Sequence, residues 1–244
     1  METLKLPQFL KLELEVLDEY VKFMGPIAFA LDRLQGESEC FLGLLMPTIQ
    51  QVSKKINACS TALQHCSVLA QPLATAVEER FPMVFSYTAE SQVFAAAAAC
   101  HPKFKLRWVS DNRKEFVKEA FLSAVAAESA TTETATSTSA LVQFATKDDL
   151  FDFDEPENSQ LIAVNKITME CLRFLEEPCD ESLEVLHQFP TVKYLFRKLN
   201  ATVPSSAPVE RLFSSGSLIS TPRRNRLTDK RFEQLLLLKA NNAV

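Results

Sequence analysis

The sequence of 244 residues is poor in several residue types, and each shortage excludes a class of protein. It contains 4 glycines, 3 tyrosines and one tryptophan beside long leucine- and alanine-rich runs, which favours a mainly α protein. No apolar run reaches the roughly 20 residues that span a bilayer, and the N-terminus lacks the apolar core of a signal peptide. The six cysteines show no regular spacing, so we expect an intracellular protein with reduced thiols.

Most patterns typical of catalysis or metal binding are also missing. The sequence has no glycine-rich phosphate loop, no nucleophile elbow and no histidine placed with a plausible nucleophile. Its only Cys/His pairs are His65-Cys66 and Cys100-His101, whereas structural zinc sites use two properly spaced pairs. We therefore predict no metal site, no cofactor and no small-molecule substrate, and we expect buried helical cysteines beside partly exposed histidines.

The net charge of −5 means that any contact with nucleic acid has to come from a local patch. The densest cationic cluster is Arg223, Arg224 and Arg226, which is too charged for a core. Two interpretations stay open: a solvated loop of cations, or a surface that faces DNA phosphates or a protein partner.

Apolar residues at helical spacing predict a helical body over residues 8–126. Its first helix, at 8–35, is expected to bend or break at Gly25-Pro26. The alanines at 95–99 predict a buried helix with closely packed neighbours.

A further helix is expected to open at Lys105, Leu106 and Trp108 and to run to about residue 126, with Trp108 in the core. The composition then changes over 127–159, first to Ala, Ser, Thr and Glu and then to acidic residues with interleaved phenylalanines. Low hydrophobicity predicts a flexible linker there, although the acidic second half could also be a docking motif.

Three short helical patterns make up the C-terminal stretch. Pro190 suits the first turn of one helix, and Ser205 and Ser206 can cap the next. Gly216 is expected to end that helix in a left-handed conformation. Thr228 is expected to cap the last helix, whose Phe232, Leu235 and Leu236 should pack inward.

The last helix contains four consecutive leucines at 235–238, which cover more than one of its faces. One face can pack within the chain, which leaves the other in need of a partner. The candidates for this partner-binding surface are Phe213, Leu235, Leu236 and Leu238. The alternative is that both faces are buried within one chain.

This C-terminal stretch resembles the dimerisation region of hAT-superfamily DNA transposases and of the host proteins derived from them. The matching residues, in order and at the family's spacing, are Phe189-Pro190, Ser205-Ser206, Glu210-Arg211, Phe213-Ser214, Gly216, Arg224-Asn225-Arg226-Leu227 and the leucines at 235–238. One departure is Val209, where the family usually has serine. A Trp-rich segment that often precedes the Phe-Pro helix is absent.

The N-terminal part resembles, more weakly, the helical domain that interrupts the hAT catalytic core. The resemblance implies three parts: a helical domain over 1–126, a linker over 127–159 and a C-terminal dimerisation module over 160–244. The whole would be a remnant of an RNase H-like transposase fold without its main strands.

The resemblance also gives Glu210 a possible meaning. In the family, the acid at this position is the last of an Asp, Asp, Glu triad that holds two divalent cations, and such a site needs clustered carboxylates. We find no counterpart of the two aspartates, and the family's N-terminal BED-type zinc finger is also absent. We therefore assign no catalytic residue to this chain.

Three hypotheses follow. The first is a transposase-derived, non-catalytic dimerisation protein that is nuclear and pairs with itself or with related hAT-type proteins. The second is a fragment of a DNA transposase that contributes Glu210 to a two-metal strand-transfer site. The third is a DNA-backbone binder that uses Arg223, Arg224 and Arg226, with steeply salt-dependent affinity.

Overall fold

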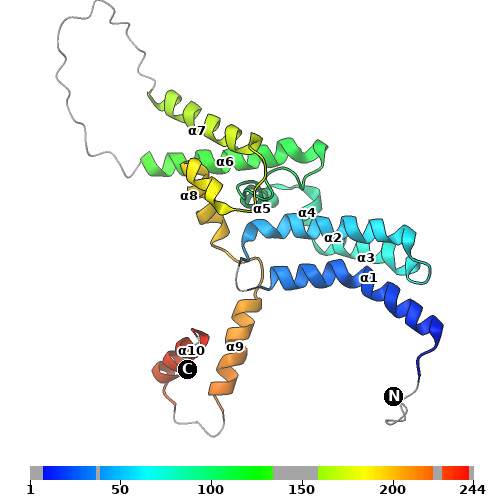
Figure 1. Ribbon diagram of the computed structural model, residues 1–244. Coiled ribbons are helices and arrows are strands. Elements are labelled where there is room, and N and C mark those ends of the chain that lie inside the picture. The colour runs from blue at the N-terminus through cyan, green and yellow to red at the C-terminus, as the bar shows by residue number, and fades with distance from the viewer. Residues whose placement is uncertain (1–7, 37–38, 134–158, 222–226, 242–244) are drawn as a thin grey trace, which may run out of the picture. The chain divides into compact units, whose positions relative to one another are not determined.

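The computed structural model describes residues 8–36, 39–133, 159–221 and 227–241 (Figure 1). Over these ranges the chain forms α-helices and short 3-10 turns without any β-strand, which confirms the prediction of a mainly α protein. None of the helices described is long and apolar enough to cross a membrane. The contacts divide the chain into two compact units, Leu42–Thr202 and a second unit that joins Met1–Phe41 to Val203–Val244.

The larger unit consists mostly of helices in consecutive order. They are α2 (Leu45–Cys59), α3 (Ser67–Arg80), α4 (Pro82–Ser86), α5 (Gln92–Ala99), α6 (Lys114–Glu133), α7 (Ser159–Glu176) and α8 (Pro190–Asn200), with 3-10 turns that include η2 (Leu42–Leu44) and η6 (Leu183–Gln188). The smaller unit consists of α1 (Lys11–Leu34), α9 (Ala207–Ile219) and α10 (Asp229–Ala240).

Helix α5 is the centre of the larger unit. Its five alanines, at 95–99, are each at most 1% exposed, as predicted for the alanine run. Helices α2, α6 and α8 and the turn η2 all contact α5. Because alanine has only a methyl group, these neighbours can approach the helix backbone closely.

A buried asparagine fixes one of these close approaches. Asn200, the last residue of α8, accepts the Gly43 N–H at Oδ1 over 2.7 Å. Its Nδ2 donates to the carbonyl oxygen of Ala97 over 3.2 Å. A single side chain therefore holds η2, α5 and α8 together, and it satisfies polar backbone groups that are buried at this junction.

Aromatic and aliphatic side chains hold α7 and α8 in the same unit. The ring of Phe174 lies 6.3 Å from that of Phe121 and 5.4 Å from that of Phe189, measured between centroids. Pro190 begins α8, as predicted, and Val192 and Leu195 on its inner face are buried. The larger unit, Leu42–Thr202, thus combines parts of the predicted 1–126 and 160–244 regions. The division of the chain into three domains stays a prediction.

Helix α1 passes through Gly25-Pro26 without a break, so of the two predicted outcomes the break is wrong and only a bend is compatible with the helix. The helix continues from Lys11 to Leu34 with Pro26 inside it. A proline in a helix interior removes one backbone hydrogen bond, but the turns on both sides of Pro26 keep theirs and the helix persists.

The boundaries of α6 also differ from the prediction. Residues 101–109 form turns, so the helix does not open at Lys105 but at Lys114. Lys105 has a φ of 45°, a left-handed conformation that an α-helix cannot contain. At the other end α6 extends to Glu133, seven residues into the predicted linker, because alanine and glutamate there are good helix formers. Residues 134–158 of that linker lie outside the described ranges.

The single tryptophan and the Cys/His pairs lie in distinct environments. Trp108 is buried, as predicted, and its Nε1 donates to the Lys105 carbonyl oxygen over 3.0 Å. Cys66 and Cys100 are buried and His65 is exposed. The expectation of a partly exposed histidine is wrong for His101, which is buried against the rings of Phe104 and Phe196.

We expect the cysteines to react with iodoacetamide in the order of their exposure. Burial raises the pKa of the Cys171 thiol to about 12 and also raises that of Cys100, so both stay protonated at pH 8. Peptide mass mapping should find Cys59 and Cys179, which are half-buried, modified first, and Cys100 and Cys171 only after unfolding. Early labelling of Cys171 in the folded protein would contradict this burial.

The same two thiols give stability a pH dependence. Above the ordinary thiol pKa of 9.0, the unfolded chain ionises Cys100 and Cys171 while the folded chain keeps them protonated. Their contribution to stability is therefore complete below pH 9 and is lost as pH rises toward 12. Each thiol should lower the free energy of unfolding by up to about 1.4 kcal/mol per pH unit in that window.

Candidate dimerisation surface

Helices α9 and α10 form a helical hairpin in which each helix contacts the other. Their N-cap residues are Ser206 and Thr228, as predicted, but neither side chain makes a capping hydrogen bond. The Ser206 hydroxyl instead donates to Oε1 of Glu210 over 2.6 Å. This bond ties a carboxylate to the first turn of α9, where a negative charge also interacts favourably with the helix dipole.

Gly216 sets how closely the two helices approach. The prediction that it ends α9 in a left-handed conformation is wrong: it lies inside the helix, which continues to Ile219, and no described glycine has a positive φ. A Cβ added at Gly216 would lie 3.1 Å from Cζ of Phe232 and 3.7 Å from Cδ1 of Leu236. A methyl group at this position would require the Phe232 ring to move by a few tenths of an ångström, so the close packing of α10 favours glycine here.

The four residues predicted to bind a partner fall into two groups. Phe213 is 70% exposed and Leu238 is 45% exposed, so both are available to a second molecule. Leu235 and Leu236 are half-buried, and Leu236 approaches Gly216 inside the hairpin. Two of the four residues therefore lie mainly on the outside of the hairpin, while the other two contribute partly to its packing.

Further exposed apolar residues of the hairpin were missed by the sequence analysis. They are Val209, Leu212, Leu218 and Leu237. Val209 could have been predicted from the sequence, because it is an apolar residue at a position where the hAT family usually has serine. Leu237, which is 55% exposed, shows that the leucines at 235–238 are not all buried within this chain.

The neighbouring Glu210 and Arg211 have separate roles. Glu210 is exposed and accepts the bond from Ser206. The Arg211 guanidinium donates through Nη2 to the Gln35 carbonyl oxygen over 2.7 Å, which connects α9 to the C-cap of α1 within the smaller unit. Among the described residues, no three His, Cys, Asp or Glu side chains are grouped so that they could hold a metal ion. The predicted phosphate-contacting residues Arg223, Arg224 and Arg226 lie outside the described ranges.

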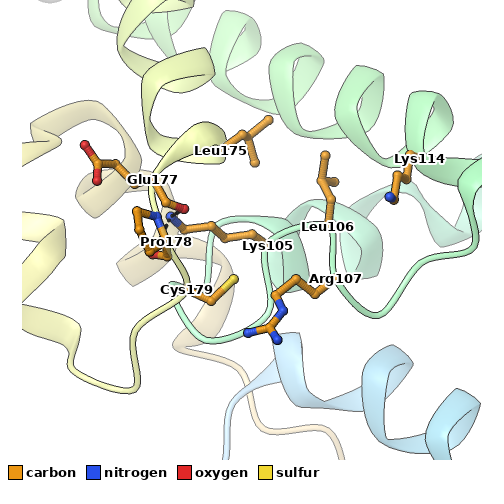
Figure 2. A pocket seen from close by; sticks show the side chains of 8 residues that line it. All are labelled: Lys105, Leu106, Arg107, Lys114, Leu175, Glu177, Pro178 and Cys179. Atoms are coloured by element: carbon orange, nitrogen blue, oxygen red, sulfur yellow. Dashed lines mark hydrogen bonds between the residues drawn. The ribbon is translucent and has the colours of Figure 1, made fainter.

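A hollow of about 530 Å³ in the larger unit is formed mainly by the segments around Lys105 and Pro178 (Figure 2). Lys105 is 2% exposed, and its Nζ donates to the carbonyl oxygens of Glu177 over 2.7 Å and Pro178 over 3.2 Å. The same Nζ lies 4.5 Å from the centroid of the Phe174 ring. Burial lowers the pKa of the Lys105 amine, an effect that nearby Cys179 partly opposes.

These contacts give Lys105 a structural role. A cation that donates to carbonyls just after the end of a helix interacts favourably with the negative end of the helix dipole, and here that helix is α7. This role was not predicted, because the sequence pattern places Lys105 at the start of a helix.

Comparison with known proteins identifies the C-terminal part of the chain. The model of the hAT family C-terminal dimerisation region matches residues 151–241. That range contains α7, α8 and the whole α9–α10 hairpin. No curated protein and no solved structure matches the chain.

Proposed function

Because residues 151–241 of this chain match the hAT family C-terminal dimerisation region, we propose that the chain is a transposase-derived dimerisation protein that acts without catalysis of its own. The exposed apolar residues of the α9–α10 hairpin carry the proposal. We place the contact with a second chain at Phe213 and Leu238, with a smaller contribution from the half-buried Leu235 and Leu236.

The physical argument is the cost of leaving such side chains in water. Burying a leucine or phenylalanine that was exposed contributes about 1.5–3 kcal/mol, and clustered exposed apolar residues are typical of protein–protein interaction sites. A two-fold symmetric pair would bury this surface twice, because the same patch is used on both subunits. The partner is a second copy or a related hAT-type protein, and we place the protein in the nucleus, where proteins derived from DNA transposons act.

We expect Leu238→Asp and Phe213→Asp each to raise the dissociation constant of the dimer by at least about tenfold. Each change places a charge on the apolar face without disturbing Gly216 and Phe232, which hold the hairpin together. Analytical ultracentrifugation between about 0.1 and 100 µM measures the association, and circular dichroism checks that helix content is kept.

Val68→Asp is the matched control, because Val68 is an exposed apolar residue on α3 of the other unit. It should leave the dissociation constant within about twofold of wild type. If the two hairpin variants also match wild type, or if the wild-type chain is monomeric throughout, the hairpin is not a self-association surface.

The absence of catalysis has its own test with Glu210→Gln. This variant keeps a side chain that can bond to Ser206 but removes the negative charge that a divalent cation requires. We expect wild type and variant to dimerise equally and neither to cleave or join DNA strands with Mg²⁺ or Mn²⁺. Strand cleavage by wild type that the variant loses would instead support the transposase-fragment hypothesis.

A further inference from the structure

Helix α1 carries a second apolar stripe that the hairpin does not explain. Its members are Leu14, Leu17, Val21, Met24, Ala28 and Leu31, which alternate steps of three and four residues. Four of them, Leu14, Leu17, Val21 and Leu31, are between 45% and 67% exposed. Four other exposed apolar residues of α1 lie outside the stripe: Leu12, Val16, Tyr20 and Phe29. The buried residues of α1, Phe23 and Ala30, lie on a different face.

This spacing is the heptad repeat of a two-helix seam. With Leu14, Val21 and Ala28 at the a positions, Leu17, Met24 and Leu31 occupy the d positions. Pro26 then falls at an f position, on the side of α1 opposite the seam, so it does not interrupt the stripe. Apolar a and d positions over nearly three heptads favour pairing with another helix.

We infer that this stripe pairs antiparallel with the same stripe of a second copy of the chain. The flanking charges select the partner and the direction. In a parallel pair, Glu13 at a g position would face Asp18 at an e position of the second copy, and two like charges there oppose pairing.

Antiparallel pairing removes that conflict. A register that places Leu14 opposite Leu31, Leu17 opposite Ala28 and Val21 opposite Met24 of the second copy puts every a residue against a d residue. The same register brings Lys11, at an e position, beside Asp32 of the second copy, and two-fold symmetry repeats this ion pair at the other end. Both side chains are exposed in the single chain. Lys11 also lies 3.7 Å from Glu15, an exposed i,i+4 pair that contributes little and that Lys11 can exchange for Asp32 of the second copy.

The test measures α1 pairing with the hairpin contact disabled, so that its failure and the failure of the proposed function can be told apart. In the full chain carrying Leu238→Asp, sedimentation equilibrium up to about 200 µM should still detect a dimer. Adding Lys11→Glu should raise its dissociation constant by about tenfold, because two attractive pairs become repulsive. Adding Asp32→Lys as well should return the dissociation constant to within about twofold of that of the chain with Leu238→Asp alone.

Lys22→Glu is the matched control on the same helix. Lys22 pairs with Asp18 over 2.6 Å, at i and i+4, and it lies at a b position away from the seam, so its reversal should leave association unchanged. A chain with Leu238→Asp that stays monomeric up to about 200 µM would overturn α1 pairing and leave the hairpin dimer intact. Association that Lys11→Glu does not weaken, or that the double reversal does not restore, would overturn the antiparallel register. If wild type and Leu238→Asp have equal dissociation constants, the hairpin contact is wrong, and α1 pairing is not affected by that result.

Discussion

Replacing Gly43 by alanine is expected to destabilise the Leu42–Thr202 unit by about 2–4 kcal/mol. An added Cβ would clash with the carbonyl oxygen of Ala97 and would lie 2.8 Å from Oδ1 of Asn200. The first neighbour is backbone of the central helix, so it cannot rotate away. Either the turn η2 moves off α5, or the bond between the Gly43 N–H and Asn200 is lost. Chemical denaturation followed by circular dichroism measures the change.

Gly25→Ala is the control for a glycine without a tertiary neighbour. Apart from its own helix and its chain neighbours, no atom lies within 4 Å of a Cβ added there, and Gly25 lies in the interior of α1. Alanine loses less backbone entropy on folding, but its Cβ is disfavoured in a helix directly before Pro26, so the free energy of unfolding should change by less than about 1 kcal/mol. If both variants behave alike, the close approach of η2 to α5 is not a constraint on the fold.

The second large effect is expected at Lys105. Lys105→Ala should reduce the free energy of unfolding by about 2–4 kcal/mol. It removes a buried aliphatic chain and leaves the carbonyls of Glu177 and Pro178 without their donor. Lys105→Met, which retains a long apolar side chain but no amine, should lie between alanine and wild type. Hydrogen exchange should show the end of α7 loosening in both variants.

Lys103 provides a nearby comparison. It pairs with Glu181 over 2.6 Å, but their side chains are 42% and 84% exposed, respectively. Because exposed ion pairs contribute little, Lys103→Ala should change stability by less than about 1 kcal/mol. A loss at Lys103 as large as that at Lys105 would mean that charge between these segments, and not buried hydrogen bonding, holds the end of α7.

The helical segments could be predicted because local rules decided them. The alanines at 95–99 have the highest helix propensity, and proline at position 190 is preorganised for a first helical turn. The three short helical patterns of the C-terminal stretch likewise required only the period of a helix. The family resemblance, confirmed by the match over residues 151–241, then identified the C-terminal region.

The errors arose where contacts between distant residues override local preference. Gly216 has the appearance of a helix-ending glycine, yet the decisive neighbour is Phe232 of the next helix. Lys105 follows a helical pattern locally, but its left-handed backbone directs the side chain to carbonyls more than seventy residues away, at Glu177 and Pro178. Neither partner is visible from the sequence around the residue itself.

The residues of the candidate dimerisation surface likewise could not be separated by local sequence alone. Periodicity identified apolar faces on α10 and α1, but it could not tell which leucines a neighbouring helix covers. Leu236 and Leu238 are two positions apart, and only the packing of α10 against Gly216 separates the half-buried one from the exposed one.

The bond between Gly43 and Asn200 has a consequence for biosynthesis. Its partners are 157 residues apart, and a ribosome adds about 5–20 residues per second, so roughly 10–30 s separate their translation. During that interval α5 lacks its contact with α8, and the Gly43 N–H lacks its acceptor. We therefore expect the Leu42–Thr202 unit to complete its folding only after α8 has left the ribosome.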